Sequence, residues 1–209
     1  MRFGLALPHY GFSLPGRPAS YAATAEWAAR AEELGFASVW VSAPFVFSLG
    51  RYGGAPEPVD ALEPMTALAG IAATTSRVRL GTLVLGAPFR PAAFTAHLAT
   101  TLAALSGGRF DLGLGSGWYA EDFEPFGFDL GTIGSRFGLL EDLRARIEEP
   151  LAAAGVPVVI VGGITNWSWT AFIVGGLCLL LAVIFASLTS VMPRSGGDYV
   201  FTSRIVPRV

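Results

Sequence analysis

The sequence is poor in the residues that build disulfides and metal sites. It contains one cysteine, Cys178, and two histidines, His9 and His97. A single cysteine excludes a disulfide within the chain, so a reducing compartment is the expected setting. No group of histidine, cysteine or carboxylate residues shows metal-ligand spacing, and we predict no metal site. Lysine is absent and arginine supplies all 14 basic side chains, which we attribute to coding bias.

Charge is also scarce, and its distribution divides the chain. The net charge of −2 favours no nucleic-acid partner. Residues 150–193 carry no charged side chain, whereas residues 1–149 hold most of the charged residues. This change in composition predicts two parts, residues 1–163 and residues 164–209.

Short apolar segments alternate with amphipathic ones up to about residue 163. The apolar segments are RFGLALP (2–8), SVWVS (38–42), VRLGTLVLG (78–86), RFDLGLG (109–115) and VPVVIVG (156–162). Such runs beside glycine or proline are typical of buried parallel strands. The alternation predicts an α/β fold with a parallel sheet, either doubly wound or a (β/α) barrel. No G-x-G-x-x-G sequence opens the first helix, which disfavours a dinucleotide-binding sheet.

Four helices are expected between these strands. The first begins after Ser20 as N-cap, and the second has Pro64 in its first turn. A third runs through residues 94–105, and a fourth begins after Arg136 with its apolar side inward. The apolar stripe of the first helix is Ala23, Trp27, Ala31 and Leu34.

Three stretches resemble one known family. They are GFASVWVS (35–42), the long stretch from LEPMTALAG to FEPFG (62–127) and GSRFGLLEDL (134–143). They resemble the luciferase-like monooxygenases, which use FMN or the deazaflavin coenzyme F-420. The resemblance covers about residues 1–163 and implies a partial TIM barrel, about half of the usual one. It also implies a flavin- or deazaflavin-dependent oxidoreductase or monooxygenase acting on a small molecule, by family in the cytoplasm.

The resemblance implies a cofactor site at the carboxyl ends of the strands. The residues it places there are His9, Ser42, Thr82, Leu83, Val84, Ser116, Gly117 and Trp118. Ala43 and Pro44 stand where the family commonly has a polar pair, and no residue is assigned a catalytic role. Because the later strands are missing, we expect flavin binding to be weak or absent. Alternatives remain open: His9 could cap a strand, Trp118 could be core, and the acidic residues at 121–124 could start a short solvated helix.

The last part of the chain has a different character. Residues 169–192 are uncharged, enough for a helix that crosses a bilayer in a single pass, although a buried helix is the alternative. The phrase MPRSGGDYVFTSR (192–204) resembles a loop of amino-acid permeases of the polyamine–organocation superfamily, over about 166–209. This part predicts a membrane location and two further hypotheses: a non-catalytic chimeric membrane fragment, or a membrane-anchored binding or structural protein. The open edges of a half-barrel also predict self-association.

Overall fold

The computed structural model describes residues 3–14, 20–50, 54, 57 and 59–160. By its contacts the chain divides into two compact units, Met1–Gly163 and Ile164–Val209. The membrane helix predicted over 169–192 and the permease-like stretch over 166–209 lie outside the described residues. Within the described ranges, no helix is both long enough and apolar enough to cross a membrane.

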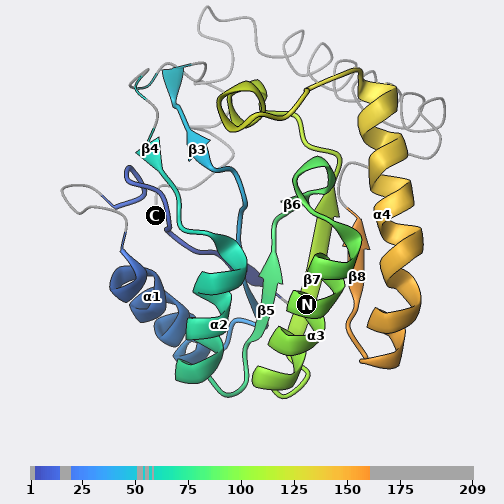
Figure 1. The fold of residues 1–209 in the computed structure, drawn as a ribbon. Helices are drawn as coiled ribbons and strands as arrows, with labels where there is room; N and C mark the ends of the chain where they lie inside the picture. The colour runs from blue at the N-terminus through green and yellow to red at the C-terminus, as the bar shows by residue number, and fades with distance from the viewer. Residues whose placement is uncertain (1–2, 15–19, 51–53, 55–56, 58, 161–209) are drawn as a thin grey trace, which may run out of the picture. The chain divides into compact units, whose positions relative to one another are not determined.

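Five parallel strands lie side by side in chain order (Figure 1). They are β1 (Gly4–Ala6), β2 (Ser38–Val41), β5 (Arg79–Thr82), β7 (Phe110–Gly115) and β8 (Val158–Ile160). A short strand, β6 (Leu85–Gly86), follows β5 and continues the pairing along β7, and the Leu83–Val84 peptide bond between them is cis. The predicted α/β fold with parallel strands is therefore confirmed, and the predicted 78–86 strand is interrupted in its middle.

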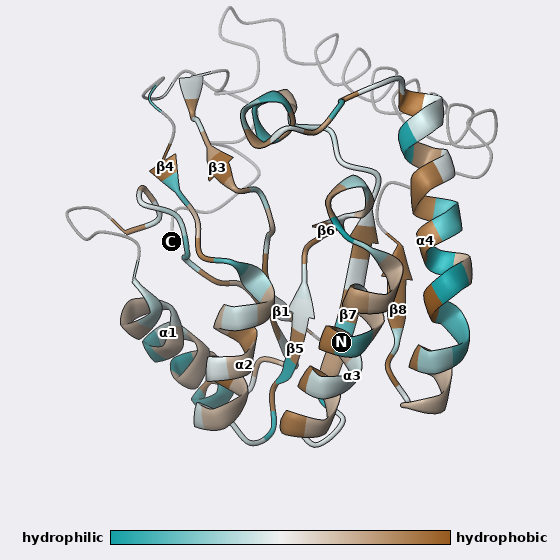
Figure 2. Cartoon of the chain, in the orientation of Figure 1, coloured by the Kyte–Doolittle hydropathy of each residue, from teal (hydrophilic) through white to brown (hydrophobic). Residues whose placement is uncertain are grey.

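Four helices connect these strands and pack in a row on one side of the sheet. They are α1 (Tyr21–Glu33), α2 (Pro64–Thr74), α3 (Ala92–Leu105) and α4 (Ile133–Ala153). Each helix packs on the next, from α1 at the left to α4 at the right of Figure 1. Figure 2 shows hydrophobic residues along the strands and hydrophilic residues on the outer side of α4. The core between the layers includes the fully buried Leu80, Leu112, Leu114 and Ile147.

The helix ends follow the sequence signals more closely than the helix faces do. The Ser20 hydroxyl accepts a hydrogen bond from the Ala23 N–H at 3.2 Å, as expected for an N-cap. The predicted inward stripe of α1 is wrong at Trp27 and Leu34, whose side chains are 42% and 62% exposed. The helix instead buries small residues such as Ala28, because it lies close against its neighbours and a small side chain permits that approach.

The start of α4 also differs from the prediction. The helix begins at Ile133, whereas the prediction had it begin only after Arg136. Thr132 is the N-cap, its hydroxyl accepts from the Ser135 N–H at 3.1 Å, and Ser135 reciprocates to form a capping box. Arg136 is thus inside the first turn of the helix.

An arginine network joins the elements at the amino-terminal edge of the sheet. The Arg109 guanidinium donates to the carbonyl oxygens of Ser106, Val78, Ala72 and Thr75 at 2.7 to 3.0 Å. These carbonyls come from the ends of α2 and α3 and from the start of β5. Arg109 therefore satisfies helix-terminal carbonyl groups that would otherwise lack intrahelical partners.

A small two-stranded antiparallel sheet stands on the opposite, carboxyl edge. Its strands are β3 (Val46–Phe47) and β4 (Val59–Asp60), and both belong to the segment between β2 and α2. The sequence pattern did not predict them. They lie beyond the carboxyl ends of the parallel strands, on one side (Figure 1).

Candidate functional site

Two of the predicted site residues meet at the carboxyl edge of the sheet. His9 follows β1 and Ser42 follows the neighbouring strand β2. Ser42 Oγ lies 3.1 Å from His9 Nε2, and the hydroxyl oxygen of Tyr10 lies 2.6 Å from the same Oγ. His9 Nδ1 lies 2.8 Å from the carbonyl oxygen of Leu7. A continuous hydrogen-bonded chain therefore runs from Tyr10 through Ser42 to His9.

The Leu7 carbonyl sets the direction of these hydrogen bonds. A carbonyl oxygen only accepts, so His9 Nδ1 carries the proton and, in the neutral ring, Nε2 is an acceptor. The Ser42 hydroxyl then donates to Nε2 and accepts from Tyr10. Burial lowers the pKa of His9, outweighing its hydrogen bonds, which favours the neutral ring. Burial raises the pKa of Tyr10, and the nearby charge of Asp122 adds to this, so the phenol keeps its proton.

The end of β5 and the two residues before β6 bring three more predicted residues to this edge. The Leu83 N–H donates to the Val41 carbonyl at 2.8 Å, and the Leu83 side chain is 42% exposed. Thr82 is fully buried, and its hydroxyl both donates to the carbonyl of Gly113 and accepts from its N–H, at 2.9 Å each. Thr82 therefore links β5 to β7, while Leu83 presents apolar surface next to the half-buried Val84.

The loop after β7 carries the last three predicted residues, Ser116, Gly117 and Trp118. Gly117 has φ of +76°, in the left-handed region that favours glycine, and a Cβ there would lie 3.0 Å from the Phe123 ring. Arg136 of α4 donates from Nε to the Gly117 carbonyl at 3.0 Å. The Trp118 side chain is 57% exposed, so the backbone of the loop is fixed while the indole reaches the surface.

The acidic stretch that follows matches the short solvated helix suggested by the sequence only at Glu121 and Glu124, which are exposed. It forms two short 3-10 turns, η3 (Ala120–Asp122) and η4 (Glu124–Phe126), and Asp122 is only 4% exposed. Asp122 Oδ1 accepts from the backbone N–H groups of Phe45 and Val46 at 2.9 and 3.3 Å. Burial raises the pKa of Asp122 more than these hydrogen bonds lower it. Through these two hydrogen bonds the buried Asp122 connects the loop after β7 to the segment after β2.

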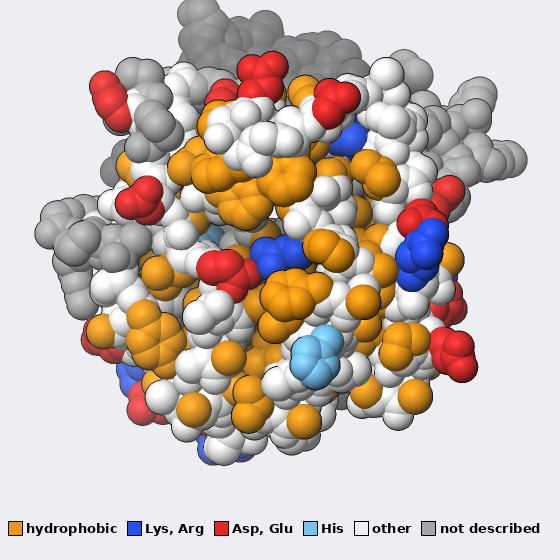
Figure 3. Space-filling model, viewed as in Figure 1, with side chains coloured by type: hydrophobic (Ala, Val, Ile, Leu, Met, Phe, Trp, Pro, Cys, Tyr) orange, Lys and Arg blue, Asp and Glu red, His pale blue; other side chains and the backbone are white. Residues whose placement is uncertain are grey.

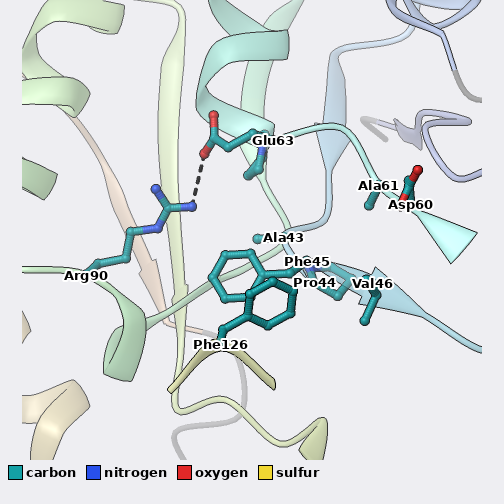
Figure 4. Close-up of a pocket in the computed structure, with 10 residues that line it drawn as sticks. Ala43, Pro44, Phe45, Val46, Asp60, Ala61, Glu63, Arg90 and Phe126 are labelled. Carbon is teal, nitrogen blue, oxygen red and sulfur yellow. Dashed lines mark hydrogen bonds and ion pairs between the residues drawn. The ribbon is translucent and has the colours of Figure 1, made fainter. Parts of the chain in front are cut away.

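A cavity of about 330 Å³ opens at Ala43, the residue after Ser42, between the segment after β2, the start of α2 and the η4 turn. Figure 4 shows the rings of Phe45 and Phe126 side by side on one wall, with centroids 4.8 Å apart. On another wall Arg90 points to Glu63, with Arg90 Nη2 and Glu63 Oε1 3.0 Å apart. Burial raises the pKa of Glu63, but the Thr66 N–H and Arg90 outweigh it and lower the pKa overall, so Glu63 is ionised.

The same face continues into a groove between α2 and α3. Figure 3 shows hydrophobic side chains gathered there around a hollow that holds one basic and one acidic group. Phe94 and Leu105 of α3 line this groove and are 55% and 64% exposed. Among the residues that the structure describes, no group of histidine, cysteine and carboxylate side chains could hold a metal ion.

Comparison with known proteins identifies the family. The profile of the family described as luciferase-like monooxygenase matches residues 1–154. The chain belongs to this family. The match of this luciferase-like chain ends before its tail, and the permease resemblance of 166–209 has no support from the comparisons.

Its relatives include both monooxygenases and deazaflavin-dependent enzymes. Over 101 residues, 47% of this chain and 26% of the relative, it is 41% identical to pyrimidine monooxygenase RutA of Bradyrhizobium sp. strain BTAi1. Over 125 residues, 59% of this chain and 36% of the relative, it is 38% identical to the F420-dependent glucose-6-phosphate dehydrogenase of Amycolatopsis mediterranei. The luciferase-like chain thus spans about a quarter to a third of the curated relatives it matches.

Solved structures share the fold at low sequence identity. EDTA monooxygenase of Chelativorans sp. BNC1 has a TM-score of 0.61 at 14% identity, over 71% of this chain and 36% of that one. An F420-dependent secondary alcohol dehydrogenase in complex with an F420-acetone adduct has a TM-score of 0.56 at 18% identity, over 71% and 42%. These similarities establish the fold that the luciferase-like chain shares with them.

The structure also identifies site residues that sequence reasoning missed. Tyr10, Asp122 and Arg136 each hold a predicted residue or its loop in place, and Arg90 lines the cavity. Tyr10 had a usable signal, since it directly follows the predicted His9 at a strand end. Asp122 and Arg136 had none, because their partners are backbone groups, which carry no sequence signal.

Proposed function

We propose that this chain forms the cofactor-facing part of a flavin- or deazaflavin-dependent oxidoreductase. The observation that carries the proposal is the family match over residues 1–154. Relatives named for deazaflavin dependence and for monooxygenase activity support it as a class, without choosing between FMN and F-420. For the reaction we propose only the class, oxidation or reduction of a small-molecule substrate.

The residues at the carboxyl edge fit such a cofactor. Leu83 and Trp118 offer exposed apolar surface against which a planar ring can pack, and Gly117 allows close approach of a ligand to the backbone. When bound, FMN or F-420 would supply hydride transfer. In this proposal Ser42, which is hydrogen-bonded to the buried His9, meets the polar edge of the ring, and Ser116 meets the side chain of the cofactor. Thr82 and Val84 shape the backbone beneath the ring. The cavity at Phe45 and Phe126 is the proposed place for substrate.

Titration of FMN and of F-420 into the full chain tests the proposal, with cofactor fluorescence as the readout. Because the chain spans about a quarter to a third of the curated relatives it matches, we expect dissociation constants weaker than about 1 μM. Trp118→Ala should weaken binding by roughly three- to tenfold, the worth of one aromatic contact. Trp27→Ala on α1, also an exposed tryptophan, is the matched control. Absence of binding, or equal effects of the two variants, would contradict the proposed site.

We also propose, as a second candidate, that the tail makes the chain a non-catalytic membrane fragment. The supporting observation is the uncharged run over 169–192. Full chain and a version ending at residue 163 should be washed with alkaline carbonate and fractionated. Only the full chain should remain with the membranes, and recovery of both in the supernatant would contradict membrane insertion.

A further inference from the structure

The hydrogen-bonded chain at the carboxyl edge connects the half-buried Tyr10 with a buried base. Tyr10 and Ser42 are half-buried, whereas His9 is 3% exposed. The acceptor of this chain is His9 Nε2, because Nδ1 donates to Leu7. We propose that Tyr10, Ser42 and His9 form a proton relay, which carries a proton from a hydroxyl or N–H group of a ligand at this edge to the His9 imidazole.

The relay balances without any further reactant. The ligand group gives its proton to the Tyr10 oxygen, Tyr10 gives its own proton to Ser42 Oγ, and Ser42 gives its proton to His9 Nε2. One bond to hydrogen breaks on the ligand, and one forms on His9. Tyr10 and Ser42 each lose one proton and gain another, so they end neutral with their hydrogen bonds reversed. The products are the ligand anion and an imidazolium, whose Nδ1–H still donates to the Leu7 carbonyl.

The surroundings hold the relay in place. The Tyr10 ring stacks on Phe12 and tilts against Phe47, with centroids 5.1 and 5.4 Å away, which fixes the direction of its hydroxyl. Asp122 is the charged group that acts on Tyr10, and its negative charge opposes formation of a phenolate there. Concerted passage through Tyr10 avoids that phenolate, because the oxygen never loses one proton before it gains the other.

The relay makes a prediction about the rate at which His9 exchanges its proton with solvent. The chain has only two histidines, so the carbon-bound ring resonances of His9 and His97 can be followed by NMR between about pH 4 and 8. In the full chain without cofactor, His9 should titrate in fast exchange. Tyr10→Phe and Ser42→Ala should each slow this exchange on the order of tenfold or more, while Ser42→Thr, which keeps the hydroxyl, restores it.

His97→Gln assigns the two signals, and His97, exposed on α3, is an internal control whose resonance should be the same in the wild type, Tyr10→Phe and Ser42→Ala. Unfolding of a variant would appear as loss of the His9 resonance of the folded chain. If Tyr10→Phe unfolds, Tyr10→Leu is tested in its place, since it also lacks the hydroxyl. Unchanged exchange at His9 in Tyr10→Phe and Ser42→Ala would overturn the relay. That the ligand is the substrate rests on the proposed function. The exchange measurement needs no cofactor, so a failed cofactor titration leaves it standing.

Discussion

At the scale of single residues, Glu32 shows how the fold uses a carboxylate for structure alone. Its Oε2 accepts from the backbone N–H groups of Ser76, Arg77 and Val78 at 3.0, 2.6 and 2.8 Å. Burial raises its pKa, but these bonds outweigh burial and lower the pKa from 4.5 to about 2. The end of α1 is thereby tied to the turn that starts β5.

Glu32 should make the chain sensitive to acid. A carboxyl whose pKa is depressed in the folded state contributes stability that is present above its unfolded pKa and is lost as the pH falls through the folded value. The wild type should therefore lose stability from about pH 4.5 down to 2, and Glu32→Gln should lose less over that window. Denaturant unfolding at a series of pH values measures this. Glu33→Gln, whose carboxylate is 65% exposed and pairs with Arg30, is the control, and identical pH profiles for wild type and Glu32→Gln would contradict the assignment.

At the scale of elements, Arg136 connects α4 to the loop that carries Trp118. Besides Gly117, it donates from Nη1 to the carbonyl oxygens of Leu130 and Gly131 at 2.8 and 3.2 Å, and it is 9% exposed. One buried guanidinium thus donates hydrogen bonds to three backbone carbonyl groups. A hydrogen bond to a charged group contributes about 1.5–3 kcal/mol to the free energy of unfolding. Removing the guanidinium also leaves buried carbonyl groups unpaired, which lowers stability further.

Arg136→Met should lower the free energy of unfolding by about 2–4 kcal/mol and speed amide hydrogen exchange over residues 116–131. Arg146→Met in the same helix breaks only an exposed i,i+4 pair with Asp142 and should cost less than about 1 kcal/mol. Denaturant unfolding and hydrogen exchange measure both effects. If the two variants lose equal stability, the buried arginine does not hold the loop.

Elements also show what sequence could and could not predict. The buried strands were readable because parallel strands covered by helices are continuous apolar runs. The order of strands then placed His9 and Ser42 at one edge. The stripe of α1 was misread at Trp27, because helical periodicity selects a face but not the side-chain size that close packing permits. The β3–β4 pair was missed since two-residue strands carry no periodic pattern.

At the scale of the whole molecule, the sheet has two edges without a partner among the described strands. β1 pairs only with β2, and β8 pairs only with β7. Exposed backbone groups on such edges are templates for pairing with another chain. Val159 on β8 is 39% exposed and adds apolar surface beside this edge. The self-association expected from the sequence stays a prediction, and these edges are the surfaces at which it would occur.

Sedimentation at increasing concentration should show this association in the wild type. Val159→Lys should shift the equilibrium toward the monomer by about tenfold or more, because a charge on an edge strand opposes pairing. Leu139→Lys, at a position 50% exposed on α4, should leave association unchanged. A wild type that stays monomeric at all concentrations would rule out the edges as contact surfaces.

The arginine network of Arg109 has a consequence for how such a chain can change over evolution. Its bonds reach only the amino-terminal edge, whereas the relay, the cavity and the Trp118 loop all lie at the other end of the strands. Substitutions in the carboxyl-edge loops therefore leave the anchoring hydrogen bonds intact. Random mutagenesis confined to exposed positions of these loops, Trp118, Ala120, Glu121, Glu124 and Asp129, should yield mostly folded variants, and the same changes combined with Arg109→Met should yield fewer. Because the hydrogen bonds of Arg109 hold the helices and strands together at the amino-terminal edge, exposed residues at the carboxyl edge can change and alter ligand specificity while the chain still folds.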